Sequence, residues 1–227
     1  GVPWESAART RYTLLNEAIL DDGQALYRAY STHRRATERA LRSVSPEELR
    51  QAIQVLGGNP QAATLDEAFT RKSVGTPLVH RPHHVVVILG ENYALWPLLP
   101  EYRDLGLAHT GQWLEAKGAH TYHFLSNGNG TMTSLNGFLT GLPDVGLYVN
   151  YMMGRHGDVD GLGIGAMMKR MGYKTVFWYG GLRSWQDIEH FTLREGFDEF
   201  HCADELLNQG ESSSWGVPDG ILFDAIR

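Results

Sequence analysis

The pattern of apolar and polar positions changes near residue 83. After this point, apolar β-branched segments alternate with short segments that end at glycine. The run Val85–Leu89 is wholly apolar and stops at Gly90, which is typical of a buried strand in a parallel sheet. We expect further strands at His120–Leu125 and Lys174–Tyr179. The expected helices in this region are Gln112–Lys117, Thr133–Leu139 and Ala166–Arg170.

This alternation predicts an α/β fold with a parallel-rich central sheet and helices on both faces. In such sheets the reactive groups lie on loops beyond the carboxyl ends of the strands. Three loops meet that condition, namely Gly90–Asn92, Ser126–Ser134 and Gly180–Asp187.

Residues 1–80 have a helical character. The segment Glu17–Arg42 is rich in Ala, Leu, Arg and Glu. Ser45 to Glu48 supplies an N-cap, a proline at the first helical position and an acid three residues after the cap. The helix that begins there should stop at Gly57–Pro60, and Thr70–Pro82 has the pattern of a connector. We therefore expect a helical arm, 1–80, and a second part, 83–227.

Composition and charge narrow the classes of function. The 227 residues include 20 basic and 26 acidic side chains, which give a net charge of −6. A chain with this balance lacks the broad positive field that attracts nucleic acid or anionic membranes. Cys202 is the one cysteine, which excludes an intrachain disulfide and a CxxC zinc site. No apolar run approaches the roughly 18 residues of a membrane span. The start of the sequence has no signal-peptide pattern.

Two of the three loops carry groups with recognisable chemistry. Glu91 is suited to bind a cation or act as a base, or else to interact with a helix dipole. The turn Ser126–Ser134 brings hydroxyls and backbone N–H groups to a helix N-terminus, where an anion can bind and a metal-activated hydroxyl can attack. A helix capped after an Asn-Gly turn is the structural alternative. The turn is not a P-loop, because Met132 occupies the position of the lysine.

The third loop and the remaining motifs leave alternatives open. Trp185 and Arg183 either line a pocket for a polar head group or belong to the core. His156 and His190 are each either a ligand or a structural residue. The string Gly161–Ala166 matches a dinucleotide fingerprint, but a polar stretch precedes it instead of a strand, which argues against nucleotide binding.

Several blocks in order resemble the lipoteichoic acid synthase-like (phosphoglycerol transferase) branch of the alkaline phosphatase/sulfatase superfamily. Bacterial phosphoethanolamine transferases are similar at a greater distance. The resemblance covers about residues 83–227 and implies an alkaline phosphatase/sulfatase-like fold. The blocks are HHVVVILGENYAL, LEAKGAHTYHFLSNGNGTMTSLNGFLTGLP, MKRMGYKTVFWYGGLRSWQD, REGFDEF and SWGVPDGILFDAI.

The resemblance implies roles for individual residues. Glu91 matches the family's metal-binding carboxylate, and Thr133 matches the nucleophilic threonine that also touches the metal. Trp185 falls near a tryptophan that lines the glycerol-phosphate pocket, and Arg183 precedes it where the family has a following arginine. Backbone N–H groups from Gly130 to Ser134 would hold the anionic oxygens. The implied cofactor is a divalent metal, namely Mn, Zn or Mg.

The implied reaction moves a phosphoglycerol- or phosphoethanolamine-type head group from a phospholipid to a hydroxyl of a glycan or polymer, through a phospho-threonine intermediate. The parent protein would be anchored in the bacterial membrane and act on its extracytoplasmic face, in the cell envelope. Two alternatives stay open. One is a hydrolase of the sulfatase or phosphodiesterase type, and the other is a catalytically silent relative that binds an anion or a glycan.

The chain departs from the family pattern near its end. The family completes its metal site with an Asp-His pair, but this sequence contains no Asp-His dipeptide, and the block Trp215–Asp219 that normally precedes the pair lies close to Arg227. We therefore expect a truncated fragment with an incomplete metal site that is inactive on its own. A sheet cut in this way would expose an edge, through which two copies could pair as a dimer.

Overall fold

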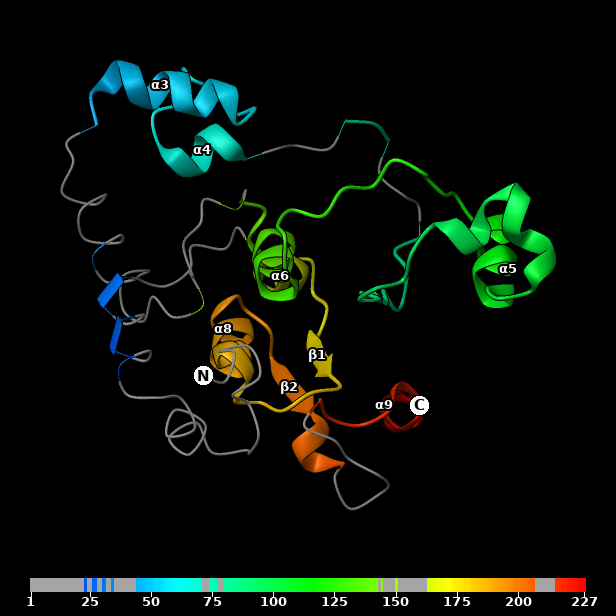
Figure 1. The fold of residues 1–227 in the computed structure, drawn as a ribbon. Helices are drawn as coiled ribbons and strands as arrows, with labels where there is room; N and C mark the ends of the chain where they lie inside the picture. The colour runs from blue at the N-terminus through cyan, green and yellow to red at the C-terminus, as the bar shows by residue number, and fades with distance from the viewer. Residues whose placement is uncertain are drawn as a thin grey trace. The chain divides into compact units, whose positions relative to one another are not determined.

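The computed structural model describes residues 23, 26–27, 30–31, 34, 44–70, 74–76, 80–142, 144, 150, 163–206 and 215–227 (Figure 1). The chain divides into two compact units, one made of Gly1–Arg71 with Asn127–Arg227 and the other of Lys72–Ser126. The expected division into an arm, 1–80, and a catalytic part, 83–227, stays a prediction. Among the described residues, no helix has the length and apolar character needed to cross a membrane.

Helix α3 (Pro46–Val55) begins as the sequence predicts. The Ser45 hydroxyl accepts a hydrogen bond from the Glu48 N–H at 3.2 Å, and the Glu48 carboxylate accepts one from the Ser45 N–H at 2.9 Å. This reciprocal pair satisfies two donors that a helix start leaves without intrahelical partners. The Glu48 carboxylate also accepts a hydrogen bond from the Ser45 hydroxyl at 2.9 Å, and the bonds that it accepts from the Ser45 N–H and hydroxyl lower its pKa.

The end of α3 also confirms the prediction. Gly57 has a φ of 76°, in the left-handed region, and its N–H returns to the Gln54 carbonyl at 3.0 Å. The Gly58 N–H reaches the Ile53 carbonyl at 2.8 Å, which completes the usual glycine-terminated helix end. A short helix, α4 (Leu65–Phe69), follows.

The unit Lys72–Ser126 contains only helical elements among its described residues. Two short 3-10 helices, η2 (Trp96–Leu98) and η3 (Pro100–Leu105), precede α5 (His109–Lys117). Helix α5 confirms the predicted helix and its end at Gly118, but it starts three residues before the expected Gln112.

Glu115 on α5 joins separate parts of this unit. Its carboxylate binds the guanidinium of Arg103 from η3 and the hydroxyl of Tyr122, and the His120 ring lies 3.8 Å away. The hydrogen bond from Tyr122 is the main reason that the pKa of Glu115 lies below its usual value. A charge-assisted network therefore fixes the segment after α5 to the helices before it.

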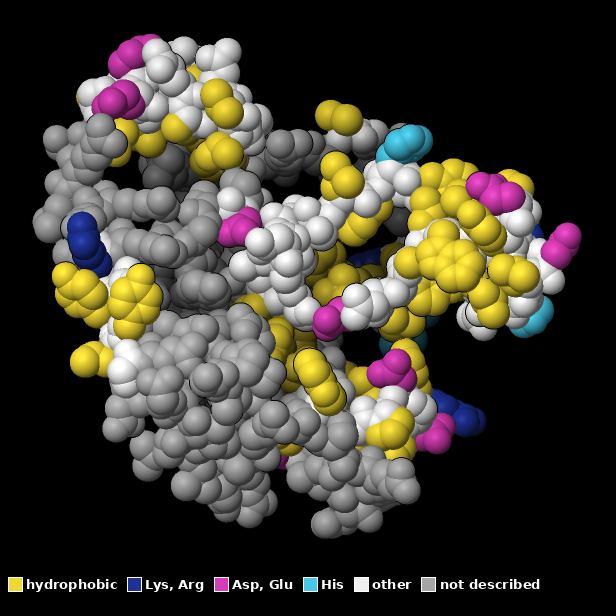
Figure 2. All heavy atoms as spheres, viewed as in Figure 1, with side chains coloured by type: hydrophobic (Ala, Val, Ile, Leu, Met, Phe, Trp, Pro, Cys, Tyr) yellow, Lys and Arg dark blue, Asp and Glu magenta, His cyan; other side chains and the backbone are white. Residues whose placement is uncertain are grey.

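Two strands predicted for this unit are wrong. Neither Val85–Leu89 nor His120–Leu125 forms a strand, and each side chain of Val85–Leu89 is at least 47% exposed. A β-branched composition favours an extended backbone, but a strand also requires a neighbour to share its ladder of hydrogen bonds. Hydrophobic side chains instead gather on the surface over the part that carries α5, where Trp113 and Leu114 are exposed (Figure 2).

The other unit contains a two-stranded parallel sheet. Strand β1 (Val176–Tyr179) pairs with β2 (Glu199–Cys202), with Trp178 directly opposite His201. Strand β1 confirms the strand predicted at Lys174–Tyr179, whereas β2 has no counterpart among the predicted strands. The fold is thus of mixed α/β type, with helices packed around a small parallel sheet. These helices are α6 (Thr131–Thr140), α7 (Ile164–Arg170), η5 (Trp185–Asp187), α8 (Ile188–Arg194), η6 (Ala203–Glu205) and α9 (Asp219–Ile226).

Asp198, just before β2, holds the beginnings of both strands together. Its Oδ2 accepts the backbone N–H of Thr175 at 2.8 Å and the Thr175 hydroxyl at 2.9 Å. Its Oδ1 pairs with the Lys169 ammonium of α7 at 2.9 Å. The backbone hydrogen bond from Thr175 is the main reason that the pKa of Asp198 falls to about 2. One carboxylate therefore ties α7, β1 and β2 to a single point.

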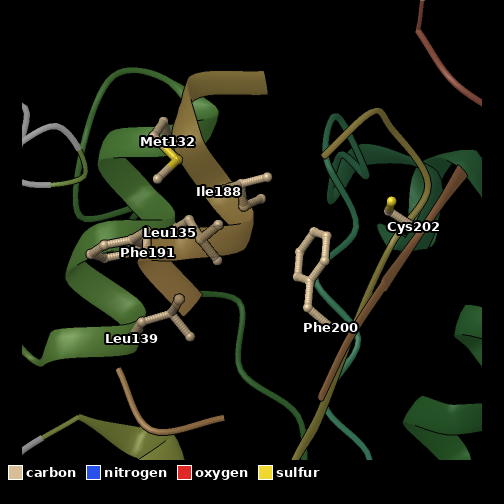
Figure 3. Close-up of a cluster of buried hydrophobic side chains, with 7 residues drawn as sticks. All are labelled: Met132, Leu135, Leu139, Ile188, Phe191, Phe200 and Cys202. Carbon is tan, nitrogen blue, oxygen red and sulfur yellow. The ribbon is translucent and has the colours of Figure 1, made fainter. Parts of the chain in front are cut away.

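The core of this unit lies between two helices and one face of the sheet. Figure 3 shows Met132, Leu135 and Leu139 of α6 near Ile188 and Phe191 of α8, with Phe200 and Cys202 on β2. The Cys202 thiol is fully buried, and this burial raises its pKa to about 12. A second, smaller apolar cluster holds α9 through Ile221, Leu222 and Ala225.

Leu139 tests this core. We expect Leu139→Ala to lower the free energy of unfolding by roughly 2 to 5 kcal/mol, because it leaves a cavity between α6 and α8. The matched control is Leu142→Ala, since Leu142 is 50% exposed whereas Leu139 is 1% exposed. Urea unfolding measures both variants, and equal losses would contradict the assignment of the core.

Asp198 gives a prediction about acid stability. A carboxyl whose pKa is depressed by folding contributes stability above its unfolded pKa of 3.8 and loses this contribution as the pH falls through about 2. Asp198→Asn should therefore lower the melting temperature most at neutral pH and least in strong acid. Asp224→Asn, at an exposed position on α9, is the control. A deficit in Asp198→Asn that is independent of pH would count against the proposed role.

Candidate functional site

The glycine-rich turn leads directly into the N-terminus of α6. Gly130 is the N-cap residue, with an extended backbone, and the helix begins at Thr131. The N–H groups of the first helical turn have no acceptor within the helix and lie at the positive end of its dipole. The turn therefore leads into a helix N-terminus, as the sequence predicted, and anion binding there stays a prediction.

Thr133, the predicted nucleophile, uses its hydroxyl inside this turn. The hydroxyl donates to the Gly130 carbonyl at 3.0 Å and accepts from the Gly130 N–H at 3.2 Å. Its proton and one of its two lone pairs are thus engaged with the N-cap. To attack a phosphorus atom, the hydroxyl must transfer the proton that it donates to the Gly130 carbonyl, and so lose a contact that helps to hold the start of the helix.

Ser134, a predicted substrate-binding residue, holds the turn against the helix. Its hydroxyl donates to the Gly128 carbonyl at 3.1 Å. A Cβ at Gly128 would lie 2.6 Å from the Cβ of Thr133, and a Cβ at Gly137 would lie 2.6 Å from that of Asn127. The two glycines are therefore needed for the turn to approach α6 so closely.

Thr131 is a functional candidate that the sequence analysis missed. It is the first residue of α6, its side chain is half-buried, and its hydroxyl has no hydrogen-bond partner among the described residues. The family resemblance points instead to Thr133, two residues further along the chain. The better signal was Gly130 itself, because the residue after an N-cap glycine begins the helix and does not cap it.

Glu91, the predicted metal ligand, lies in a turn of the other compact unit. The Tyr93 N–H bonds to the Gly90 carbonyl at 3.3 Å, and Asn92 has a φ of 58°, in the left-handed region. The Glu91 side chain is exposed. Its pairing with Thr133 around a metal stays a prediction, since the two residues belong to different units.

The fit to a divalent metal is partial. A carboxylate and a threonine hydroxyl are oxygen donors that suit Mg or Mn. However, the described part of the chain contains no cluster of three or more His, Cys, Asp or Glu side chains arranged to hold a metal. His190 is engaged by Asp187, with 2.6 Å between its Nδ1 and the carboxylate, and His156 lies outside the described residues.

Arg183, predicted to bind substrate, is surrounded by carboxylates. Asp204 accepts its backbone N–H at 2.9 Å and its Nε–H at 3.3 Å, and Glu189 accepts from Nη1 at 2.9 Å. Glu205 approaches Nη2 at 3.5 Å. An anionic head group would have to compete with these groups for the guanidinium.

Trp185 packs against the core of the sheet unit. Its ring lies 5.7 Å from the ring of Tyr179, and it contacts the cluster formed by α6 and α8. The next two residues, Gln186 and Asp187, both have left-handed backbones, with φ of 49° and 58°. These contacts favour the structural alternative for Trp185 over a place in a head-group pocket.

The string Gly161–Ala166 has a packing explanation in its described part. A Cβ at Gly165 would lie 2.7 Å from the Glu195 carbonyl, and one at Gly163 would lie 3.0 Å from the same oxygen. The Ala166 N–H bonds to that carbonyl at 3.2 Å. The start of α7 therefore needs these glycines to pack on the chain after α8, and no nucleotide is required to account for them.

Gly128 tests the packing of the turn on α6. We expect Gly128→Ala to cost on the order of 1 to 3 kcal/mol of unfolding free energy, because the added methyl group overlaps Thr133. Gly220→Ala is the matched control, since no atom lies within 4 Å of a Cβ built there on α9. Chemical denaturation should show a loss in the first variant and no loss in the second. Equal stability of the two would contradict the close approach.

Comparison with known proteins adds no family to this picture. No protein-family model, curated protein or solved structure matches the chain. The resemblance therefore rests on the motifs quoted above. The structural findings independent of it are the parallel strand pair, the helices around it and the glycine-rich turn at the start of α6.

Proposed function

We propose that the chain is part of a metal-dependent transferase with an alkaline phosphatase/sulfatase-like fold. The enzyme moves a phosphoglycerol- or phosphoethanolamine-type head group from a phospholipid to a hydroxyl of a glycan or polymer. The observation that supports the proposal is the α6 N-terminus, where a tightly packed glycine-rich turn brings hydroxyl side chains beside backbone N–H groups that have no acceptor within the helix. The proposed site of action is the extracytoplasmic face of a bacterial membrane.

The reaction needs a hydroxyl that can reach phosphorus and donors that hold the phosphate oxygens. The threonine oxygen forms a bond to phosphorus, the bond to the diacylglycerol oxygen breaks, and that oxygen takes the proton. The acceptor hydroxyl oxygen then forms a bond to phosphorus, the bond between phosphorus and the threonine oxygen breaks, and the threonine oxygen takes the acceptor's proton. The N–H groups of the first turn of α6 would stabilise the charge on the phosphate oxygens in both steps.

Two threonines compete for the role of nucleophile. The sequence favours Thr133, whose hydroxyl is engaged with Gly130, whereas Thr131 has a hydroxyl without a partner among the described residues. We keep both in the proposal, with Thr133 as a positioning residue if Thr131 reacts. A divalent metal, when bound, would neutralise phosphate charge and lower the pKa of the reacting hydroxyl, and Glu91 would supply a carboxylate to hold it.

A second candidate is a catalytically silent domain that binds an anionic head group or a glycan. It is supported by the hydrogen bonds that engage the Thr133 hydroxyl, because they make this residue part of a helix cap. A hydrolase of the sulfatase or phosphodiesterase type would differ from the transferase in using water as the acceptor.

We also propose that two copies of the chain can pair at an open edge of the sheet, since each described strand has one neighbour.

Metal-dependent adduct formation tests the enzyme proposal. The chain is incubated with Mn, Zn or Mg and with mixed micelles of phosphatidylglycerol or phosphatidylethanolamine, and its intact mass is measured. Because the metal site of this chain is expected to be incomplete, we expect no turnover to an acceptor, but only a stoichiometric head-group phosphate adduct that is lost in Glu91→Ala. It should also be lost in the threonine variant, Thr131→Ala or Thr133→Ala, that removes the nucleophile. Glu101→Ala, an exposed carboxylate in the same unit as Glu91, should keep the adduct.

Calorimetry separates the remaining outcomes. Titration of the metal alone should give binding that weakens at least tenfold, about 1.4 kcal/mol, in Glu91→Ala. No adduct and no metal binding, together with binding of inorganic phosphate that Gly128→Ala abolishes, would support the silent domain. Absence of all three signals would contradict both candidates.

A further inference from the structure

His201 lies on the sheet face opposite the core. Along β2, Phe200 and Cys202 belong to the core cluster, so Glu199 and His201 project to the other face. Across the sheet, His201 pairs with Trp178 in the register, and the two rings stack with centroids 4.4 Å apart and planes 24° apart. The imidazole is therefore held against an indole face, where a cation is favoured.

Both ring nitrogens of His201 face carboxylates. Nδ1 lies 2.8 Å from Glu205 of η6, and Nε2 lies 3.4 Å from Glu199 of β2. A neutral imidazole has one N–H and one lone pair, so it can donate to only one of them. The doubly protonated ring alone satisfies both contacts.

The surrounding charges hold these carboxylates in place. Lys174, before β1, binds Glu199 at 2.5 Å, and Arg183 approaches Glu205 at 3.5 Å. Arg183 is itself held by Glu189 of α8 and by Asp204 of η6. The charged residues of α9, which packs on β1, are Asp219, Asp224 and Arg227, and the last two pair with each other at 3.8 Å.

We propose that His201 is a pH-sensitive latch whose protonated ring fastens η6 to the sheet and whose deprotonation releases it. Glu205 is the point of attachment, because it is the residue of η6 that the ring binds. Glu199 and Trp178 hold the ring in position. The latch does not depend on the transferase proposal, since none of its residues belongs to the turn or to α6.

The direction of the effect follows from the contacts. The hydrogen bond to Glu205 is the main reason that the pKa of His201 rises above the ordinary histidine value of 6.5. A group whose pKa is raised by folding contributes its full stability below its unfolded pKa and loses it as the pH rises through the folded pKa. The latch is therefore closed in mild acid and opens as the pH increases.

An NMR titration of the full chain tests the latch. It follows the imidazole C2–H of His201, assigned by its loss in His201→Gln. We expect a midpoint above 6.5 in the unmodified chain and a lower midpoint in Glu205→Gln. A midpoint at or below 6.5, or one that Glu205→Gln leaves unchanged, would overturn the proposal.

Hydrogen exchange measures the release itself. The Leu206 N–H bonds to the Ala203 carbonyl at 2.9 Å and closes η6, so its protection factor reports this helix. In the unmodified chain, the protection factor of Leu206 should fall as the pH rises, with the same midpoint as the His201 titration. In His201→Gln it should stay low at every pH. His190→Gln is the matched control, because His190, on α8, pairs with Asp187 of η5 instead, and this variant should behave like the unmodified chain. A protection factor that does not change with pH in the unmodified chain would contradict the latch. A pH-dependent fall that remains in His201→Gln would also contradict it.

Discussion

The sheet unit depends on the carboxylate of Asp198. Two parallel strands joined through a helix have no hairpin to set their register, so some other contact must align their first residues. Asp198 does this by binding the backbone and hydroxyl of Thr175, and it adds α7 through Lys169. The start of α7 also packs closely on the end of α8, where a Cβ at Gly165 would lie 2.7 Å from the Glu195 carbonyl.

Local structure was readable from the sequence where a few neighbouring residues determine it. The Ser45 cap, the end of α3 at Gly57 and the strand before Gly180 all depend on near neighbours, and the structure confirms them. The strand predicted at Val85–Leu89 is wrong because strand formation also depends on a pairing partner, which the composition of the run does not reveal. Strand β2 was not predicted because its short run alternates polar and apolar residues. The partner that makes it a strand, β1, is distant in the sequence.

The candidate site was predictable as a turn but not as an arrangement of hydroxyls. The sequence predicted a glycine-rich turn that runs into a helix, and the structure has this turn, with Gly128 packed closely on Thr133. Which hydroxyl caps the helix and which is left over depends on where α6 begins, and a difference of two residues exchanges the roles of Thr131 and Thr133. Arg183 shows the same limit, because its acidic partners Asp204 and Glu205 lie about twenty residues away in the sequence.

The burial of Cys202 has a practical consequence for handling the protein. As the one cysteine of the chain, with its thiol inside the core and its pKa near 12, it has almost no thiolate to offer while the fold is intact. Disulfide-linked pairs of chains can therefore form only after the sheet opens. For the same reason, the rate at which an alkylating reagent labels Cys202 reports the opening of the sheet.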